Sequence, residues 1–197
     1  MLAFVARVCL LSIACCVLGS AQVAELTVAA KRSTVSDGYV GQAGLIPRRF
    51  NLEDGSGANL IFSMNGRSYF GHELTYGYER DQLTLGDSDQ GNVQAHKFYY
   101  DFVVHAMKRD SRIRPFFLAG LGFSSFVPPS EAAIQASNIT KFGANFGGGL
   151  KLRLLDHVGV RLDVRGLVAG KPNFFDQSGI EGNLHNVEYS VGLSWLF

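Results

Sequence analysis

The sequence predicts an all-β protein, an up-and-down antiparallel transmembrane β-barrel of about eight strands. Three observations support this prediction. Long segments alternate, with a period of two residues, between an apolar, charge-free face and a polar face. Short and long connections between these segments alternate along the chain. No apolar run after residue 21 reaches the ~18 residues of a membrane-spanning helix, so any span must consist of strands.

Residues 1–21 have the pattern of a secretory signal peptide. A positive charge at Arg7 precedes the apolar run Val8–Leu18, and Gly19–Ala21 offers the small residues that a signal peptidase requires. All three cysteines lie inside this segment. We therefore expect a mature outer-membrane β-barrel domain over residues 22–197 that contains no disulfide bond.

The C-terminal part of the chain contains the most regular strand patterns. In Lys141–Leu154, one face carries only apolar residues and glycine, while all three charges lie on the other face among small residues. Val158–Val168 and Val187–Phe197 repeat this pattern, with valine, leucine and aromatic residues on the charge-free face. These faces are long enough to cross a bilayer as tilted strands of about 9–11 residues.

Five further segments complete the predicted barrel, with less regular alternation. They are Leu26–Ser33, Asn59–Met64, Tyr69–Leu83, Val93–Met107 and Arg114–Phe126. The first has the weakest pattern, so the number of strands depends on it. An even number of strands returns both ends of the barrel domain to the periplasmic side.

The predicted connections differ in length at the two ends of the barrel. Asn65–Arg67, Lys108–Ser111 and Leu155–His157 are short, and the first contains the Asn-Gly pair of a tight hairpin turn. The connections at the other end are longer: Thr34–Ala58, Gly86–Asn92, Val127–Asn138 and Gly170–Asn183. Outer-membrane barrels combine short periplasmic turns with long external loops in this way.

Alternation alone leaves open which face of each strand points outward. A soluble periplasmic ligand-binding barrel would place its apolar faces inside and its polar faces in water. Here the polar faces carry too many charges for a dry core, because an unpaired buried charge is very costly. The apolar faces are also long enough to span a bilayer, and the last one ends on Trp195–Phe197. We therefore predict lipid-facing apolar faces and keep the soluble barrel as the alternative.

The charges on the polar faces would then point into the barrel. These candidate interior residues are Glu73, Glu79, Lys97, Asp101, Lys141, Lys151, Arg153, Arg161, Asp163, Arg165 and Glu188. Side chains are just able to fill the interior of an eight-stranded barrel. Because acidic and basic residues are nearly balanced, we expect a polar plug of ion pairs and hydrogen bonds rather than an ion-conducting or gated lumen.

Three segments carry a family resemblance: Arg114–Gly122, Phe146–Arg153 and Tyr189–Phe197. On these segments the chain resembles the small bacterial outer-membrane β-barrel proteins and is similar to the transmembrane domain of the outer membrane protein A family. The resemblance implies insertion into outer-membrane lipid. It also implies a C-terminal signal, made by Tyr189, Trp195 and Phe197, that the barrel-assembly machinery recognises. Larger members carry a periplasmic peptidoglycan-binding domain, which does not follow Phe197 here, so we expect no cell-wall anchoring.

No motif in the sequence indicates a cofactor, a metal ion or a nucleic-acid partner. The histidines include no pair at metal-ligand spacing. Gly147–Gly149 lies inside a predicted strand and lacks the lysine-serine or lysine-threonine pair of a phosphate loop. The net charge of +1 lacks the basic excess of nucleic-acid-binding domains.

These observations favour a non-enzymatic outer-membrane barrel with a structural or surface-interaction role. We expect a plugged interior and long external loops, and no motif indicates the external ligand or partner. The soluble periplasmic barrel is the first alternative. A barrel-type lipid hydrolase is the second, although the late strands contain no His-x-Ser stretch like that of the lipid A deacylases, which use a Ser-His-acid arrangement.

Overall fold

The computed structural model describes residues 23–36, 39–43, 48–66, 69–85, 88–129, 138–172 and 183–197, most of which lie in strands. The strands are β1 (Val23–Ser36), β2 (Tyr39–Ala43), β3 (Arg48–Asn65), β4 (Phe70–Leu85), β5 (Ser88–His105), β6 (Ile113–Val127), β7 (Ile139–Arg153), β8 (Val158–Gly170) and β9 (Asn183–Leu196). Within these ranges, no helix is long and apolar enough to cross a membrane. The predicted signal peptide, residues 1–21, lies outside the described residues.

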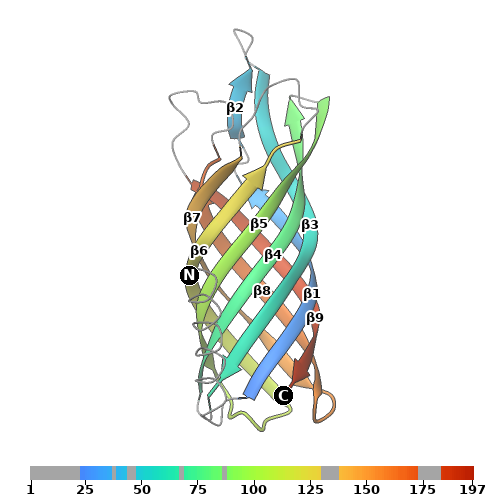
Figure 1. Ribbon diagram of the computed structural model, residues 1–197, viewed down its shortest axis with the longest axis vertical. Helices are drawn as coiled ribbons and strands as arrows, with labels where there is room; N and C mark the ends of the chain where they lie inside the picture. Colours follow the sequence, from blue (N-terminus) through green and yellow to red (C-terminus); the bar gives the residue numbers. More distant parts are fainter. Residues whose placement is uncertain are drawn as a thin grey trace, which may run out of the picture.

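Eight of these strands form one closed antiparallel barrel (Figure 1). The hydrogen-bonded order is β1-β9-β8-β7-β6-β5-β4-β3, and β1 also pairs with β3, which closes the ring. The last strand lies against the first from Glu25↔Leu196 to Ser36↔His185. Closure pairs every strand on both sides, which is the condition for a sheet to persist in lipid. The predicted fold, an up-and-down barrel of eight strands, is confirmed.

The short strand β2 adds to the outer part of β3. Its residues pair with Arg48–Asn51, at the end of the molecule opposite the C-terminus (Figure 1). The barrel wall is therefore taller on this side than the membrane-spanning segments alone would make it.

Each of the eight predicted segments corresponds to one barrel strand, but β3 and β5 begin well before the predicted Asn59 and Val93. Two of the predicted long connections are wrong. Thr34–Ala58 contains the end of β1, all of β2 and the first part of β3, and Gly86–Asn92 contains the start of β5. These parts of the strands extend beyond the lipid-facing band, where outward-facing residues need not be apolar. Alternation of hydrophobicity is lost there, although the backbone remains a strand.

Three short connections lie at the end of the barrel that holds the C-terminus (Figure 1). Backbone hydrogen bonds close them: Gly66 to Phe70, Ser111 to Lys108, and Leu154 and Leu155 to Val158. Because outer-membrane barrels place their short turns in the periplasm, we name this the periplasmic end and the opposite one the outer end. Most of the predicted loops Val127–Asn138 and Gly170–Asn183 lies outside the described residues.

The apolar faces of the strands point outward. Phe117, Phe142 and Leu193 are 70%, 69% and 65% exposed. A continuous apolar exterior of this kind is stable in lipid and not in water. The alternative of a soluble barrel, which requires a polar exterior, is therefore wrong.

The outer end of the barrel interior contains a group of packed apolar side chains. We name this group the apolar cluster; it consists of Leu52, Leu83, Val93, Ala95, Phe126 and Leu184, with Val35 and Ile139 packed against it. Its members come from the outer ends of their strands. Charged residues occupy the interior below it.

Candidate functional site

Charged side chains inside the barrel form two clusters of ion pairs. The arginine cluster consists of Glu25, Glu73, Asp101, Lys151, Arg161, Asp163 and Arg165, and the lysine cluster consists of Lys31, Glu79, Lys97 and Glu188. All eleven are buried. Along β4, Glu73 comes first from the periplasmic end, then Glu79, then Leu83 of the apolar cluster. The arginine cluster, the lysine cluster and the apolar cluster therefore follow one another from the periplasmic end to the outer end.

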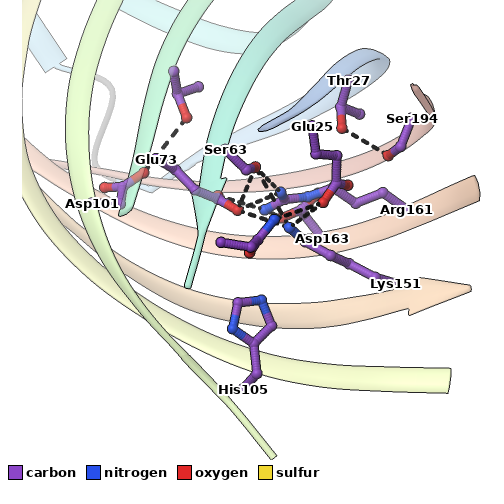
Figure 2. A network of polar contacts seen from close by, with 12 residues as sticks. Glu25, Thr27, Ser63, Glu73, Asp101, His105, Lys151, Arg161, Asp163 and Ser194 are labelled. Atoms are coloured by element: carbon purple, nitrogen blue, oxygen red, sulfur yellow. Dashed lines mark hydrogen bonds and ion pairs between the residues drawn. The ribbon is translucent and has the colours of Figure 1, made fainter. Parts of the chain in front are cut away.

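Arg161 is the centre of the arginine cluster (Figure 2). Its Nη1 and Nη2 donate to Oε1 and Oε2 of Glu73 at 2.7 and 2.8 Å. Its Nε and Nη2 donate to the two carboxylate oxygens of Asp163, both at 2.8 Å. The guanidinium carbon lies over the Phe116 ring, 4.5 Å from its centre. This fully buried cation thus has two carboxylates and an aromatic ring as neighbours.

The other two cations of the arginine cluster extend this arrangement. Lys151 Nζ lies 2.8 Å from Glu25 Oε2 and 3.1 Å from Glu73 Oε1. Arg165 reaches Asp101 at 3.2 Å and Asp163 at 3.3 Å. Because burial of a charge is costly, such a cluster persists only when each charge has close partners of opposite sign.

In the lysine cluster, each lysine contacts both glutamates. Lys31 Nζ lies 2.6 Å from Glu79 and 3.0 Å from Glu188. Lys97 Nζ lies 2.5 Å from Glu79 and 2.8 Å from Glu188. The two lysines and two glutamates therefore alternate around a closed group of four charges.

Each cluster contains an ion pair that joins opposite walls of the barrel. In the ring of eight strands, β8 and β4 are four places apart, and so are β5 and β9. Arg161 on β8 reaches Glu73 on β4, and Lys97 on β5 reaches Glu188 on β9. Side chains therefore cross the barrel interior at two levels.

Glycines on the inward faces leave space for these long side chains. A Cβ atom on Gly77 would lie 3.0 Å from Lys31 Nζ and 2.8 Å from the Asn59 side-chain oxygen. A Cβ atom on Gly149 would lie 2.7 Å from the ring of Phe116, the ring that supports Arg161. Gly149, which belongs to the run Gly147–Gly149, thus contributes to the packing of the charged interior.

Nine of the eleven predicted interior residues lie in the two clusters, and two lie elsewhere. Arg153 is half-buried at the periplasmic end, where its Nη2 donates to the Arg109 carbonyl at 2.6 Å. Lys141 is half-buried near the outer end, with its aliphatic stem beside Gly170.

Sequence reasoning missed Glu25 and Lys31, which belong to β1. Both lie on the inward face of β1, together with Thr27, Ala29 and Ser33. The period-two spacing of these residues was the available signal. His105 is also buried at the periplasmic end, with Nδ1 3.3 Å from the Tyr69 carbonyl oxygen (Figure 2).

Of the three residues of the predicted C-terminal signal, Tyr189 and Trp195 are exposed on β9, and Phe197 directly follows the strand. Tyr189, Trp195 and Phe197 are 52%, 53% and 65% exposed. The Phe197 amide also donates to the Ala24 carbonyl at 2.9 Å, which ties the end of the chain to β1. Recognition of these residues by the assembly machinery stays a prediction.

The interior carboxylates form ion pairs with lysine and arginine side chains. In the part of the chain that the structure describes, no three His, Cys, Asp or Glu side chains are grouped so that they could hold a metal ion.

Solved structures of outer-membrane barrels resemble this fold at low sequence identity. OprG from Pseudomonas aeruginosa is 14% identical with a TM-score of 0.59, and the match covers 90% of this chain and 97% of that chain. Neisserial surface protein A is 13% identical with a TM-score of 0.58, covering 90% and 98%. Ail of Yersinia pestis, in complex with the heparin analogue sucrose octasulfate, is 13% identical with a TM-score of 0.55, covering 89% and 99%.

No curated protein sequence matches the chain. The family model described as the outer membrane protein beta-barrel domain matches residues 9–197. That match includes the whole described barrel and agrees with its closed ring, its short turns and its apolar exterior. The chain therefore belongs to the outer membrane protein beta-barrel domain family, and it is a protein of the bacterial outer membrane.

Proposed function

We propose that this protein has a structural or surface-interaction role in the outer membrane and that its interior is plugged. In this proposal the protein is neither a channel nor an enzyme. It acts as a rigid barrel embedded in the membrane, and the outer ends of its strands are available for contact with molecules outside the cell.

The observation that carries the proposal is the pair of ionic crossings between opposite strands. Arg161–Glu73 and Lys97–Glu188 each place a charged, hydrogen-bonded contact across the barrel. A barrel of eight strands leaves an interior that side chains alone can fill. An ion entering this interior would have to separate buried partners, which costs about 3–5 kcal/mol for a single pair.

The apolar cluster supports the same conclusion at the outer end. Leu83, Val93 and Phe126 are 2%, 0% and 2% exposed. A hydrated ion has no polar partner among these side chains, so an apolar layer adds a barrier above the charged clusters. The interior thus combines three successive layers of packed side chains.

The surface-interaction part of the proposal rests on the outer end. There, a hollow of about 820 Å³ is lined by polar residues including Arg80, Asp89, Asn92 and Gln94, together with Pro129. Strands that continue past the lipid-facing band hold these side chains on a rigid support. Such a surface suits recognition of a polar partner.

Conductance of the purified protein in planar bilayers tests the plug. We expect no steady conductance from the wild-type protein. The double variant Arg161→Ser with Glu73→Ser shortens both sides of one crossing and should raise the frequency of open events. Arg112→Ser, which changes an exposed residue of a periplasmic turn, is the control and should behave as the wild type does. A steady, large conductance of the wild-type protein would overturn the plug and establish a channel.

A further inference from the structure

Two arginines lie on the outward face of neighbouring strands near the outer end of the barrel (Figure 1). Arg32 of β1 pairs with Ser56 of β3, and Ser56 pairs with Arg80 of β4. Residues paired directly across antiparallel strands point to the same side of the sheet, and all three are exposed. Because neighbouring strands lie about 4.8 Å apart, the backbone positions of the two arginines are about 10 Å apart. We name Arg32, Ser56 and Arg80 the arginine row.

The arginine row lies where the apolar exterior ends. On the outward face of β1, Val28 is 60% exposed, and the next outward residues toward the outer end are Ala30 and Arg32. Tyr189 of β9 pairs with Arg32 on its other side and is 52% exposed, and Tyr78 is the preceding outward residue on β4. Tyrosine side chains gather at the boundary between lipid tails and headgroups. The row therefore lies at the level of the lipid headgroups of the outer leaflet.

Charge at this level of the membrane needs a partner. An arginine beside lipid is costly unless its guanidinium group reaches the headgroup region. Among the residues that the structure describes, neither Arg32 nor Arg80 forms an ion pair. The phosphate groups of lipid headgroups are anions that lie at the same level, so they complement the charge of the row.

The exposed carboxylates of this end lie farther from the membrane and accept hydrogen bonds from the barrel itself. Asp54 accepts from a backbone amide of β1 at 3.2 Å, and Glu53 accepts from the Thr84 hydroxyl at 3.0 Å. Asp89 accepts from the Gly91 amide at 2.8 Å. It pairs with a residue of β4 four positions beyond the row, about 13 Å along the strand. Positive and negative charges are thus separated by height.

The side chain of Arg80 is held so that its outer nitrogens remain available. Its Nε donates to the Tyr78 hydroxyl at 2.9 Å, and its guanidinium carbon lies 5.8 Å from the centre of the Tyr78 ring. A tyrosine hydroxyl orients the guanidinium group without neutralising its charge. Guanidinium groups bind phosphate through paired, parallel N–H···O bonds. Both Nη groups of Arg80 can form such bonds.

The positions of the two arginines favour a lipid that carries two phosphate groups. The Tyr78 hydroxyl donates to Gln94 of β5 at 3.4 Å, so Arg80 is held on the side of β4 that faces away from β1. The two guanidinium groups therefore face separate anions. Beyond the row, side-chain amides of Gln90, Asn92 and Gln94 line the hollow at the outer end. Amides both donate and accept hydrogen bonds, which suits the hydroxyl groups of sugars.

We propose that Arg32 and Arg80 bind a diphosphorylated glycolipid of the outer leaflet, with one phosphate group at each arginine. The acyl chains of this lipid lie along the apolar surface nearer the periplasmic end, where Val28 and Leu60 are exposed. Binding fixes the outer limit of the apolar exterior at the level of the headgroups. This inference extends the surface-interaction role proposed above and does not depend on the plug, which conductance tests separately.

The test compares the binding of diphosphoryl and monophosphoryl lipid A. Protein in phosphatidylethanolamine nanodiscs that contain one of the two lipids is released, and its bound lipid is counted by native mass spectrometry. Wild-type protein should retain the diphosphoryl form about tenfold more strongly, the effect of one charged hydrogen bond. Arg32→Gln and Arg80→Gln should each abolish this preference. Arg112→Gln removes the same charge from an exposed position at the periplasmic end and should keep it.

Three outcomes of this comparison would overturn the proposal. Equal retention of both lipids by the wild-type protein would mean that the second phosphate group has no partner. A preference that survives in folded Arg32→Gln and Arg80→Gln protein would assign the binding to other residues. An equal loss in Arg112→Gln would show diffuse attraction between the lipid and a positively charged protein.

A second arm separates the lipid from free phosphate. Line broadening of inorganic phosphate in ³¹P spectra is recorded with the protein in phospholipid-free detergent. Phosphate binding that needs Arg32 and Arg80, combined with lipid retention that does not, would overturn the lipid as the source of the anion.

Folding of each variant is checked by its heat-dependent mobility in SDS gels. If Arg80→Gln does not fold, Tyr78→Phe takes its place, because it removes only the hydroxyl that orients Arg80. It should weaken the preference for the diphosphoryl lipid. An unchanged preference in that folded variant would contradict the proposal.

Discussion

Arg161 and Glu73 form a paired hydrogen bond between opposite walls of the barrel, although 88 residues separate them in the chain. The guanidinium group of one strand meets the carboxylate of the strand four places away in the ring. No local sequence pattern contains this relationship, because it exists only when the barrel is closed. Because Arg161 and Glu73 depend on each other, a single substitution at either residue should change the free energy of unfolding measurably.

The first prediction concerns this pair. Arg161→Met should lower the free energy of unfolding by about 3–5 kcal/mol, because it leaves the buried Glu73 carboxylate without its main partner. Glu73→Leu should have a comparable effect. The double variant should lose less than the sum of the two, with a coupling of about 0.5–3 kcal/mol. Denaturant unfolding in lipid vesicles provides the measurement, and strictly additive losses would show that the pair does not act as a unit.

The second prediction concerns the lipid-facing surface of β7. Phe146→Arg should destabilise the folded barrel by about 2–4 kcal/mol if this position is near the middle of the bilayer, and Thr140→Arg, close to the outer end, by about 0–1 kcal/mol. Both residues are exposed and point outward from the same strand. Unfolding in vesicles measures the difference. Equal costs at the two positions would contradict the lipid-facing placement of Phe146.

The third prediction concerns the space that Gly77 leaves for Lys31. Gly77→Ala should cost about 1–3 kcal/mol, because the added Cβ atom crowds Lys31 Nζ and the Asn59 side chain. Gly170→Ala is the matched control, since its Cβ atom would meet only the flexible stem of Lys141 at an ordinary distance of 3.4 Å. Similar unfolding free energies for the two variants would mean that the lysine cluster adjusts without strain.

The fourth prediction concerns orientation in the membrane. Asn92 near the start of β5 and Lys108 in the turn after β5 are both exposed. A cysteine at Asn92 should react with a membrane-impermeant maleimide on intact cells. A cysteine at Lys108 should react only after the outer membrane is permeabilised. The reverse labelling pattern would place the short turns outside the cell.

The fifth prediction concerns the C-terminal signal implied by the family resemblance. Phe197→Ala keeps the backbone amide that donates to Ala24 but removes the side chain. It should reduce folded protein in the outer membrane more than it reduces stability in detergent, because one such side chain contributes at most about 1.5–3 kcal/mol. Leu193→Ala, which changes an equally exposed residue of the same strand, is the control. Equal amounts of folded Phe197→Ala and Leu193→Ala protein in cells would argue against recognition.

The barrel and its exterior could be predicted because they depend on local alternation. Phe142 and Phe146, four residues apart and therefore on the same face of a strand, identify the lipid-facing side of β7 without knowledge of any other strand. In β1 the contrast between an apolar outward face and a polar inward face is weaker, since the outward face carries Ala30 and Arg32. The period-two signal in β1 is therefore weaker than in the later strands, and Glu25 and Lys31 were not assigned to the interior.

Interior composition could be predicted, but the internal arrangement could not. Which charges meet depends on the stagger between strands and on side-chain conformation, so the contact between Lys97 and Glu188, 91 residues apart, has no sequence signature. The apolar cluster was missed for a different reason. Leu83 and Val93 continue faces that carry charges nearer the periplasmic end, so alternation groups them with polar residues.

The pairing of β1 with β9 has a consequence for the order of folding. Glu25, near the start of the barrel, finds its lysine partner Lys151 only on β7, and Lys31 contacts Glu188 on β9 as well as Glu79 on β4. The strands β1 to β4 alone therefore cannot neutralise all of their lumenal charges. Until the ring closes, these side chains must remain hydrated, because lipid would penalise each of them separately. We therefore expect a hydrated, open intermediate before β1 pairs with β9, and closure of the ring would expel that water.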